Sequence, residues 1–387
     1  MSAPRAAVAS PVRRIVVAVL AAATVVAAAL TGATDSQAGA RLDGVPRADC
    51  GKGSRPETSI QGRVPTADYK SGRALKGYRC NAVQVGHYQS LGGLKVQRYT
   101  DQAGRTCAYY DTSLLLLNIG HLLEGPNLGV VVLDMTDPKR PRKTANLISP
   151  AMLNPHESLL VNHRRGLLVG VLGTLATAPG IMDVYDISKD CRRPRLLSTT
   201  PSALLGHESG FAPDGKTFWS AGAAGFTLTA VDLTNPRLPK VLDVHTGVIY
   251  HGLRLSPDGR TMYVANMVIP TADSILDDPG LHVLDVSEVQ DRVPDPKVRK
   301  IGEVSWPEVS IPQVAEPFTR GGRTYVFEVD EFTDWFGHKW SVDFINGPVG
   351  AARIIDVTNP RRPKVVSNVR LEVHDPRLRD DAVMDDP

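Results

Sequence analysis

The sequence predicts an all-β protein made of repeated four-stranded units, and three observations lead to this prediction. A short strand pattern that ends in aspartate recurs along the chain, an Asx-Pro turn follows three of the copies, and no long amphipathic helix lies between them. An α/β fold would need such a helix between successive strands. The 34 Gly and 29 Pro of the 387 residues also favour a fold with many turns.

The first forty residues are expected to be a signal peptide. Arg13 and Arg14 precede an uninterrupted run of apolar and small residues at 15–30, and small residues at 31–33 and 38–40 suit a signal peptidase. The alternative is a retained membrane anchor, since this run is only slightly too short to span a bilayer. We expect cleavage of residues 1–40, and therefore a secreted protein without a membrane attachment.

Residues 41–80 are predicted to be a basic N-terminal arm. They contain nine Lys or Arg against four acids and lack a hydrophobic period. Such a segment either wraps the domain surface as an extended chain or contacts an anionic polymer of the cell surface. The whole chain has a formal net charge of only +3, which argues against the strong basic field of a nucleic-acid-binding protein. We expect a monomer that binds no nucleic acid.

Export would place the four cysteines in an oxidising compartment, where pairing is the default. Cys50, Cys80, Cys107 and Cys191 allow three connectivities, which the sequence alone does not distinguish. We expect Cys80 to pair with Cys107, because both flank the first repeat unit, and Cys50 could then join Cys191. No two cysteines have the C-x-x-C spacing, which argues against a redox or zinc site.

The strand pattern that ends in aspartate defines the repeat. Its five copies end at Asp134, Asp186, Asp232, Asp285 and Asp356. The intervals of 52, 46, 53 and 71 residues between them suit four short strands with their turns. We therefore predict a β-propeller of five to seven four-stranded blades over residues 81–374. A weaker copy precedes the first, with Gly93 to Val96 as its strand and Asp101 displaced.

Two kinds of turn separate the strands. Asx-Pro turns follow the aspartates at 136–138, 234–236 and 358–360, where the Asx side chain bonds the backbone ahead and proline fixes its own φ. Glycine turns that precede an apolar strand are typical of β-hairpins. They stand at Gly166, Gly215, Gly259 and Gly321.

The order strand, Asp, Val or Ile, Thr or Ser, Asx, Pro resembles the LVIVD-repeat proteins, a family of predicted β-propellers. The string Ser-Pro-Asp-Gly-Arg-Thr-Met-Tyr-Val-Ala-Asn at 256–266 is similar to the hairpin of YVTN-type and WD40-like propellers. The resemblance covers residues 80–374. It implies the architecture and little about activity, because such repeats serve unrelated functions.

The predicted ring is incomplete at its end. After His374, each earlier copy would continue into a glycine turn and another strand, but only the polar tail 375–387 follows. A ring without its closing strands has an exposed edge. Either the chain is truncated, which we favour, or the N-terminal segment supplies the closing strand.

Histidines recur in phase with the repeat. Each follows the preceding repeat aspartate by 18 to 22 residues, at His156, His207, His251 and His374, and Glu316 is the nearest candidate in the copy without one. Equivalent positions in a propeller lie at one height around its axis, so these side chains could converge there. Neutral imidazoles with a carboxylate suit zinc, copper or iron. Propeller enzymes of the selenium-binding, methanethiol-oxidase type are similar in using such histidines, although their other motifs are missing here.

Two alternatives compete with a metal site. In the first, each His bonds the backbone of the neighbouring blade as a structural repeat residue. The two His-Glu-Ser strings also suggest a hydrolase, but consecutive side chains of a strand alternate between faces, so Glu157 and Glu208 are predicted to face away from the histidines. Ser158 and Ser209 are expected near the histidines. A serine nucleophile is disfavoured because no Gly-x-Ser-x-Gly elbow is present.

Residues 327–350 interrupt the repeat and contain two of the four Trp. Trp335, Phe336, His338 and Trp340 are candidate ligand-binding residues, because loops on a propeller face commonly bind and aromatic side chains supply much of the binding energy. The alternative is that these side chains fold back and cap the channel.

Two function classes follow. The class that the sequence favours is a secreted, non-catalytic module that binds an unidentified protein or surface polymer through its face loops. The other is a metal-dependent enzyme, an oxidoreductase or hydrolase, with the histidine site on the propeller axis. The sequence identifies no substrate and no certain cofactor.

Overall fold

The structure of the protein is a computed structural model. It describes residues 44–90, 92–93, 95–112, 128–173, 180–267, 279–306, 311–331 and 350–379. The expected signal peptide lies outside these ranges. Among the described residues, no helix has the length and apolar composition that a membrane crossing needs.

Twenty strands of the described ranges form five four-stranded antiparallel sheets, each with its strands in chain order. The first sheet contains β1 (Val96–Thr100), β2 (Thr106–Asp111), β3 (Val130–Asp134) and β4 (Arg142–Leu147). The second contains β5 (Leu160–Asn162), β6 (Leu167–Val171), β7 (Met182–Asp186) and β8 (Arg195–Thr200). The third contains β9 (Glu208–Phe211), β10 (Thr217–Ala221), β11 (Thr227–Asp232) and β12 (Lys240–Thr246).

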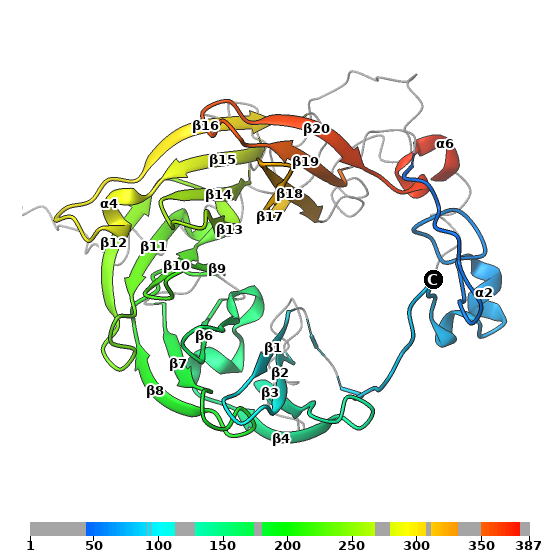
Figure 1. The fold of residues 1–387 in the computed structure, drawn as a ribbon, viewed down its shortest axis with the longest axis horizontal. Coiled ribbons are helices and arrows are strands. Elements are labelled where there is room, and N and C mark those ends of the chain that lie inside the picture. The colour runs from blue at the N-terminus through cyan, green and yellow to red at the C-terminus, as the bar shows by residue number, and fades with distance from the viewer. Residues whose placement is uncertain are drawn as a thin grey trace, which may run out of the picture.

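The fourth sheet contains β13 (Tyr250–Leu255), β14 (Thr261–Asn266), β15 (Gly280–Asp285) and β16 (Arg299–Ser305). The fifth contains β17 (Ile311–Arg320), β18 (Arg323–Glu331), β19 (Ala352–Asp356) and β20 (Lys364–Val369). The five sheets surround a common centre as blades, with the first strand of each blade innermost and the fourth outermost (Figure 1). The predicted all-β propeller with four-stranded blades is confirmed. We number the blades 1 to 5 in chain order.

Each repeat aspartate ends the third strand of its blade, as the spacing predicted. The Oδ1 atom of Asp134 accepts a hydrogen bond from the backbone N–H of Thr136 at 2.9 Å, and the other four aspartates make the same bond two residues ahead. This bond starts the turn into the fourth strand. In blade 4 the short helix α4 (Ser287–Gln290) replaces the Asx-Pro turn. The prediction of a weaker copy of this pattern from Gly93 to Asp101 was wrong. Val96 begins the first strand of a blade, β1, and Asp101 directly follows that strand.

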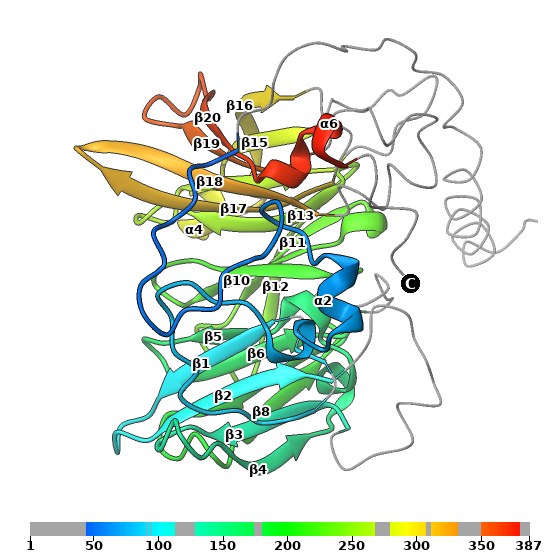
Figure 2. The same ribbon diagram turned by 90° about the vertical axis from the view of Figure 1, so that its right-hand side faces the viewer.

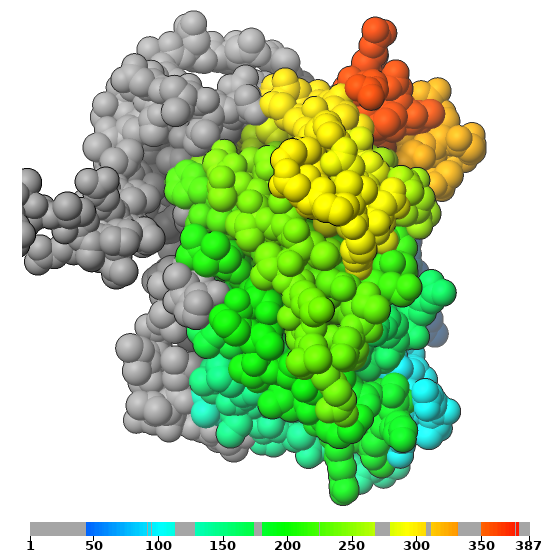
Figure 3. Space-filling model, turned by 90° about the vertical axis from the view of Figure 1, so that its left-hand side faces the viewer, coloured from blue at the N-terminus to red at the C-terminus, as the bar shows by residue number. Residues whose placement is uncertain are grey.

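The hydrophobic core lies between neighbouring blades. Tyr109 and Val132 of blade 1 pack with Leu168 of blade 2, and Trp219 of blade 3 packs with Leu253 of blade 4. All five side chains are fully buried. In the space-filling view of Figure 3, the green and yellow segments of blades 3 and 4 follow one another around the outer surface.

Residues 44–80 form a small unit rather than an extended arm. The unit contains α2 (Thr66–Lys70) and the 3-10 helix η1 (Ala74–Lys76). Its backbone bonds the segment that follows β20, from Val45 N–H to the Arg370 carbonyl at 2.7 Å and from Val373 N–H to the Gln61 carbonyl at 3.1 Å. Figures 1 and 2 show this blue unit beside α6 (Pro376–Arg379), between blades 5 and 1.

The disulfides differ from the expected pairing. Cys50 is bonded to Cys80 and Cys107 to Cys191, so the predicted Cys80–Cys107 bond was wrong. Cys107 lies in β2 and is fully buried against blade 2, where the loop after β7 brings Cys191. The backbone N–H of Cys191 also donates to the carboxylate of Asp101 at 3.0 Å. Two disulfides point to an oxidising setting, extracellular or periplasmic.

Blade 5 contains a buried cluster of Arg353 with two acidic side chains. The guanidinium of Arg353 donates to Glu328 Oε2 at 2.6 Å and lies 2.9 Å from Asp330 Oδ2, with its Cζ 3.8 Å from the centre of the Trp306 ring. Burial and the neighbouring Asp330 carboxylate raise the pKa of Glu328 to about 9, although Arg353 opposes the shift. The folded protein therefore holds a proton on Glu328 at pH values where the unfolded chain has released it.

This raised pKa predicts a loss of stability with rising pH. The contribution of Glu328 is fully present below its unfolded pKa of about 4.5 and is lost as the pH rises towards 9, with a slope of at most about 1.4 kcal/mol per pH unit. Glu328→Gln should flatten this slope, measured as the free energy of unfolding in urea at pH 5, 7 and 9. The exposed Glu316→Gln is the control. Equal slopes for wild type and Glu328→Gln would contradict the prediction.

Candidate functional site

The chain enters blade 2 through a tight turn that carries His156 and Glu157. The residues His156–Ser158 form a 3-10 helix, η3, and the φ of His156 is +48°. This left-handed conformation is unusual for a residue with a Cβ and is typically found where function requires it. Ser158 closes the turn, since its Oγ donates to the Pro155 carbonyl at 2.5 Å, and the same Oγ accepts from the Val171 N–H of β6 at 2.8 Å.

His207 precedes the first strand of blade 3. Its Nδ1 lies 2.6 Å from the backbone carbonyl of Gly173 in blade 2. Because a carbonyl oxygen only accepts, Nδ1 carries the proton and Nε2 presents its lone pair. This is the arrangement that a metal-binding histidine usually has, with its second nitrogen held by a carbonyl or carboxylate. The predicted structural role, a bond to the neighbouring blade, is thus present in His207 and leaves Nε2 available.

His251 lies in β13 at the start of blade 4 and is 98% buried. Its Nε2 is 3.4 Å from Glu157 Oε2 and 3.2 Å from Oε1 of Glu331, the last residue of β18.

The three histidines and Glu157 form one cluster. The ring centres of His156 and His207 are 4.9 Å apart, and those of His207 and His251 are 5.1 Å apart. The Nε2 atoms of His156, His207 and His251 lie 3.9, 3.6 and 3.4 Å from Glu157 Oε2. Two ligands of a tetrahedral zinc ion are about 3.3 Å apart when each bond is about 2.0 Å. The cluster therefore has nearly the dimensions of a metal site.

The prediction that Glu157 and Glu208 face away from the histidines was wrong. It assumed strand geometry, but the 3-10 turn at His156 directs His156 and Glu157 to the same side. Glu208, the first residue of β9, has a carboxylate oxygen within 4.8 Å of ligand atoms of Glu157 and His251. Ser158 and Ser209 are fully buried, and their hydroxyls bond the backbone.

Blades 1 and 5 contribute side chains that the sequence did not indicate. Lys95, just before β1, donates from Nζ to Glu208 Oε1 at 2.6 Å and to the Glu157 carbonyl at 2.5 Å. Gln313 in β17 donates from Nε2 to Glu157 Oε1 at 3.0 Å. All five blades thus supply polar residues to one point, either from their innermost strands or from the segments that lead into them. The one sequence signal for Lys95 is its position directly before the first strand of its blade, which is also the position of His207.

The charges of the cluster depend on burial and on each other. Burial and the adjacent His207 lower the pKa of His156 to about 4. Burial would raise the pKa of Glu157, but the adjacent imidazoles of His207, His251 and His156 outweigh burial and lower it to about 2. Burial opposes a charge on His251 as well, yet the bond to Glu331 raises its pKa above the usual value. At neutral pH the cluster contains an ionised carboxylate and a neutral His156.

Four buried atoms of the cluster have no hydrogen-bond partner among the described residues. They are His156 Nδ1, Glu157 Oε2, Glu208 Oε2 and His251 Nδ1. Buried polar atoms are normally paired, and an unpaired carboxylate oxygen is especially costly. Two of these four atoms are carboxylate oxygens, so the cluster favours a bound cation.

Two predicted ligands do not join the cluster. His374 lies in the 3-10 helix η5 (Glu372–His374) near the N-terminal unit, where its Nδ1 accepts from the Leu371 N–H at 2.9 Å. Glu316 is exposed and pairs with Arg254 at 2.7 Å. The predicted ligand-binding residues Trp335, Phe336, His338 and Trp340 lie outside the described residues.

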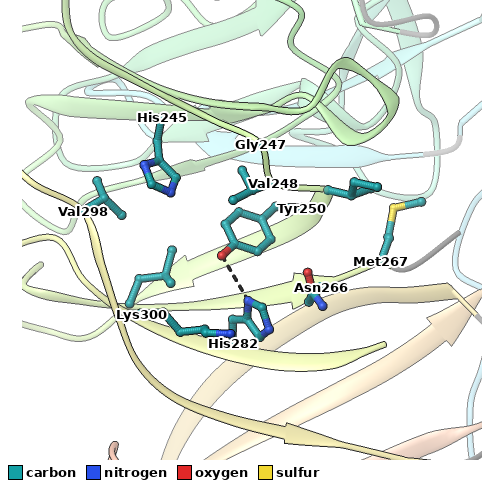
Figure 4. A pocket seen from close by; sticks show the side chains of 11 residues that line it. His245, Gly247, Val248, Tyr250, Asn266, Met267, His282, Val298 and Lys300 are labelled. Carbon is teal, nitrogen blue, oxygen red and sulfur yellow. Dashed lines mark hydrogen bonds between the residues drawn. The ribbon is translucent and has the colours of Figure 1, made fainter. Parts of the chain in front are cut away.

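A separate cavity of about 290 Å³ lies between β12 and blade 4 (Figure 4). His245, His282 and Lys300 contribute nitrogen atoms to its wall, and the hydroxyl of Tyr250 lies 3.1 Å from His282 Nδ1. Its wall does not include the cluster histidines.

Gly252 allows blades 4 and 5 to approach each other beside the cluster. A Cβ at this position would lie 2.4 Å from the Gln313 carbonyl oxygen. Gly252→Ala should therefore lower the free energy of unfolding by about 1–3 kcal/mol, measured in urea. Gly170→Ala is the control, because its Cβ would meet only side-chain atoms, at 3.1 Å or more. An equally large loss of unfolding free energy in Gly170→Ala would contradict the explanation that a Cβ at position 252 collides with the Gln313 carbonyl.

No protein-family model matches the sequence, and no curated protein matches it. Membership of the LVIVD-repeat family therefore stays a prediction. The structure is similar to the periplasmic gluconolactonase PpgL of Pseudomonas aeruginosa, with 16% identity, a TM-score of 0.45 and coverage of 70% of this chain and 69% of that one.

It is also similar to a protein of unknown function from Desulfotomaculum acetoxidans DSM 771, with 15% identity, a TM-score of 0.46 and 78% of each chain covered. A third similar structure, provisionally assigned as a 6-phosphogluconolactonase, comes from Bacteroides uniformis ATCC 8492. It has 13% identity and a TM-score of 0.42, and the match covers 64% of this chain and 63%, less than two thirds, of that one. We take no activity from these similarities.

Proposed function

We propose that the protein is a metal-dependent enzyme whose metal site is the cluster of His156, Glu157, His207 and His251. The observation that carries the proposal is that the Nε2 atoms of three histidines, from three blades, lie 3.4–3.9 Å from one carboxylate oxygen. Imidazole and carboxylate donors suit zinc, iron and manganese. The alternative of a non-catalytic binding module finds no support in the described residues.

The position of the cluster supports catalysis rather than a structural metal. His156 and His251 are buried to 97% and 98%, whereas the side chains of His207 and Glu157 are each 14% exposed. The metal would thus be bound by buried side chains on one side and reached by solvent on the side of His207 and Glu157. A catalytic metal needs such an open coordination position. A metal ion there would lower the pKa of a bound water and supply a nucleophile at neutral pH.

The carboxylates beside the cluster favour hydrolysis over redox chemistry. Glu208 and Glu331 lie next to His251, and Glu331 can accept a proton from water. No cysteine sulfur belongs to the metal-binding groups that the described residues form, so these groups lack the thiolate ligands that copper(I) prefers. We therefore propose a hydrolase.

Metal analysis tests this function. Protein purified from a secreting host should contain at least one equivalent of zinc, iron or manganese, and a chelator should abolish hydrolysis of chromogenic carboxylic and phosphate esters, which the metal restores. His207→Ala should remove the metal, while His282→Ala, outside the cluster, should retain it. Metal-free protein that takes up no zinc, iron or manganese from micromolar solution would overturn the proposal.

A further inference from the structure

We propose that the cluster holds two divalent ions bridged by Glu157, and that its substrate is a dianionic phosphate ester. This inference rests on the proposed metal-dependent function and specifies it. The first ion would bind His156, His207 and Glu157, and the second would bind His251, Glu208 and Glu157.

Two donor groups, rather than one, satisfy the distance requirement for a metal. The ligand atoms of His156, Glu157 and His207 lie within 4.8 Å of one another, and so do those of Glu157, Glu208 and His251. Glu157 belongs to both groups. Centres with two ions about 3.5–4 Å apart characteristically share such a carboxylate.

Glu208 supplies the electrostatic reason for a second ion. Its side chain is 2% exposed, and Lys95 neutralises only Oε1, at 2.6 Å. Its Oε2 is buried without a hydrogen-bond partner among the described residues, as is Oε2 of Glu157. Two carboxylates whose ligand atoms lie within 4.8 Å repel each other in a buried environment. One ion between His156 and His207 would leave the Glu208 oxygen unpaired, whereas a second ion would bind it.

The two positions differ in their donors. The first has two imidazoles and the shared carboxylate, while the second has one imidazole and two carboxylates. Glu331 Oε1 lies 3.2 Å from His251 Nε2 and adds negative charge beside the second position, although it does not belong to this group of ligand atoms. The second position is therefore richer in oxygen donors and suits manganese or magnesium better than the first does.

The charge of the loaded centre indicates the substrate class. Two divalent ions and Lys95 exceed the charges of Glu157, Glu208 and Glu331 by two positive units. A phosphate monoester with two negative charges would neutralise this excess, with its oxygens on both ions. In its hydrolysis, the water oxygen bonds to phosphorus as the P–O bond to the alcohol breaks. One water proton passes to the departing alcohol oxygen and the other stays on the released phosphate.

The number of bound ions tests the inference. Ion-free protein is titrated with Mn²⁺ in equilibrium dialysis, and the wild type should bind two equivalents. Glu208→Gln and His156→Ala should each bind one, and the control His282→Ala should bind two. Electron paramagnetic resonance of the wild type with two equivalents should show coupled Mn²⁺ ions, which neither one-ion variant can show. Inorganic phosphate should then bind the two-ion wild type at least tenfold more tightly than Glu208→Gln.

The outcomes separate the two proposals. One Mn²⁺ in the wild type, with an unchanged number in Glu208→Gln, would overturn the second ion and leave the metal-dependent function standing. No ion in the wild type would overturn both. Two coupled ions with equal phosphate binding in wild type and Glu208→Gln would overturn the substrate class. Unfolding midpoints within a few degrees of the wild type show that each variant is folded.

Discussion

His156→Gly and His156→Ala should both bind zinc at the position formed with His207 at least about 100-fold more weakly than the wild type, yet His156→Ala should be the less stable protein by about 1 kcal/mol. Both variants remove the same imidazole and leave nearly the same space. They differ in one methyl group at a residue whose φ is +48°, a conformation that glycine adopts without strain.

The comparison separates the ligand from the backbone conformation. Zinc affinity is measured by titration against a competing chelator, and stability of the ion-free proteins by urea unfolding. At ordinary helix or strand positions alanine is the more stabilising residue, so the expected order is reversed here. Greater stability of His156→Ala would show that the left-handed turn relaxes when the ring is removed. Wild-type affinity at the position formed with His207, in either variant, would contradict the assignment of His156 as a ligand.

Removal of the Cys107–Cys191 disulfide should cause the largest loss of stability. The bond closes a loop of 84 residues, and its loss should lower the free energy of unfolding by about 4.5 kcal/mol through the entropy of the unfolded chain. Both sulfurs are fully buried between blades 1 and 2. The measurement is urea unfolding of Cys107→Ala/Cys191→Ala.

The other disulfide provides the matched control. Cys50–Cys80 closes 30 residues and lies within the N-terminal unit, outside the blades. Cys50→Ala/Cys80→Ala should therefore leave the main unfolding transition nearly unchanged and increase proteolytic cleavage within 44–80. A similar loss in the main transition for both variants would show that this unit and the blades unfold together.

The strands were predictable from the sequence because their signals are local. An aspartate that bonds the backbone two residues ahead marks the end of each third strand, and glycine turns mark each first hairpin. The convergence of His156, His207 and His251 followed from their common phase in the repeat. These features depend on a few neighbouring residues or on periodicity.

The chemistry of the cluster was not predictable in the same way. The direction of Glu157 depends on one 3-10 turn with a left-handed His156, which no composition rule indicates. Lys95 and Gln313 do not repeat the histidine pattern, since they come from the blades that lack it. The disulfide pairing depended on which loop of blade 2 covers β2, and this is a matter of tertiary packing.

The origin of the ligands in different blades has a consequence for folding. Each blade is a local meander, so its strands can pair early, whereas His156 and His251 are joined only after three successive blades have docked. Ion binding adds RT ln(1 + [L]/Kd) to the stability of the docked state alone. A bound ion would thus add to the packing between neighbouring blades and make blades 2, 3 and 4 unfold more cooperatively.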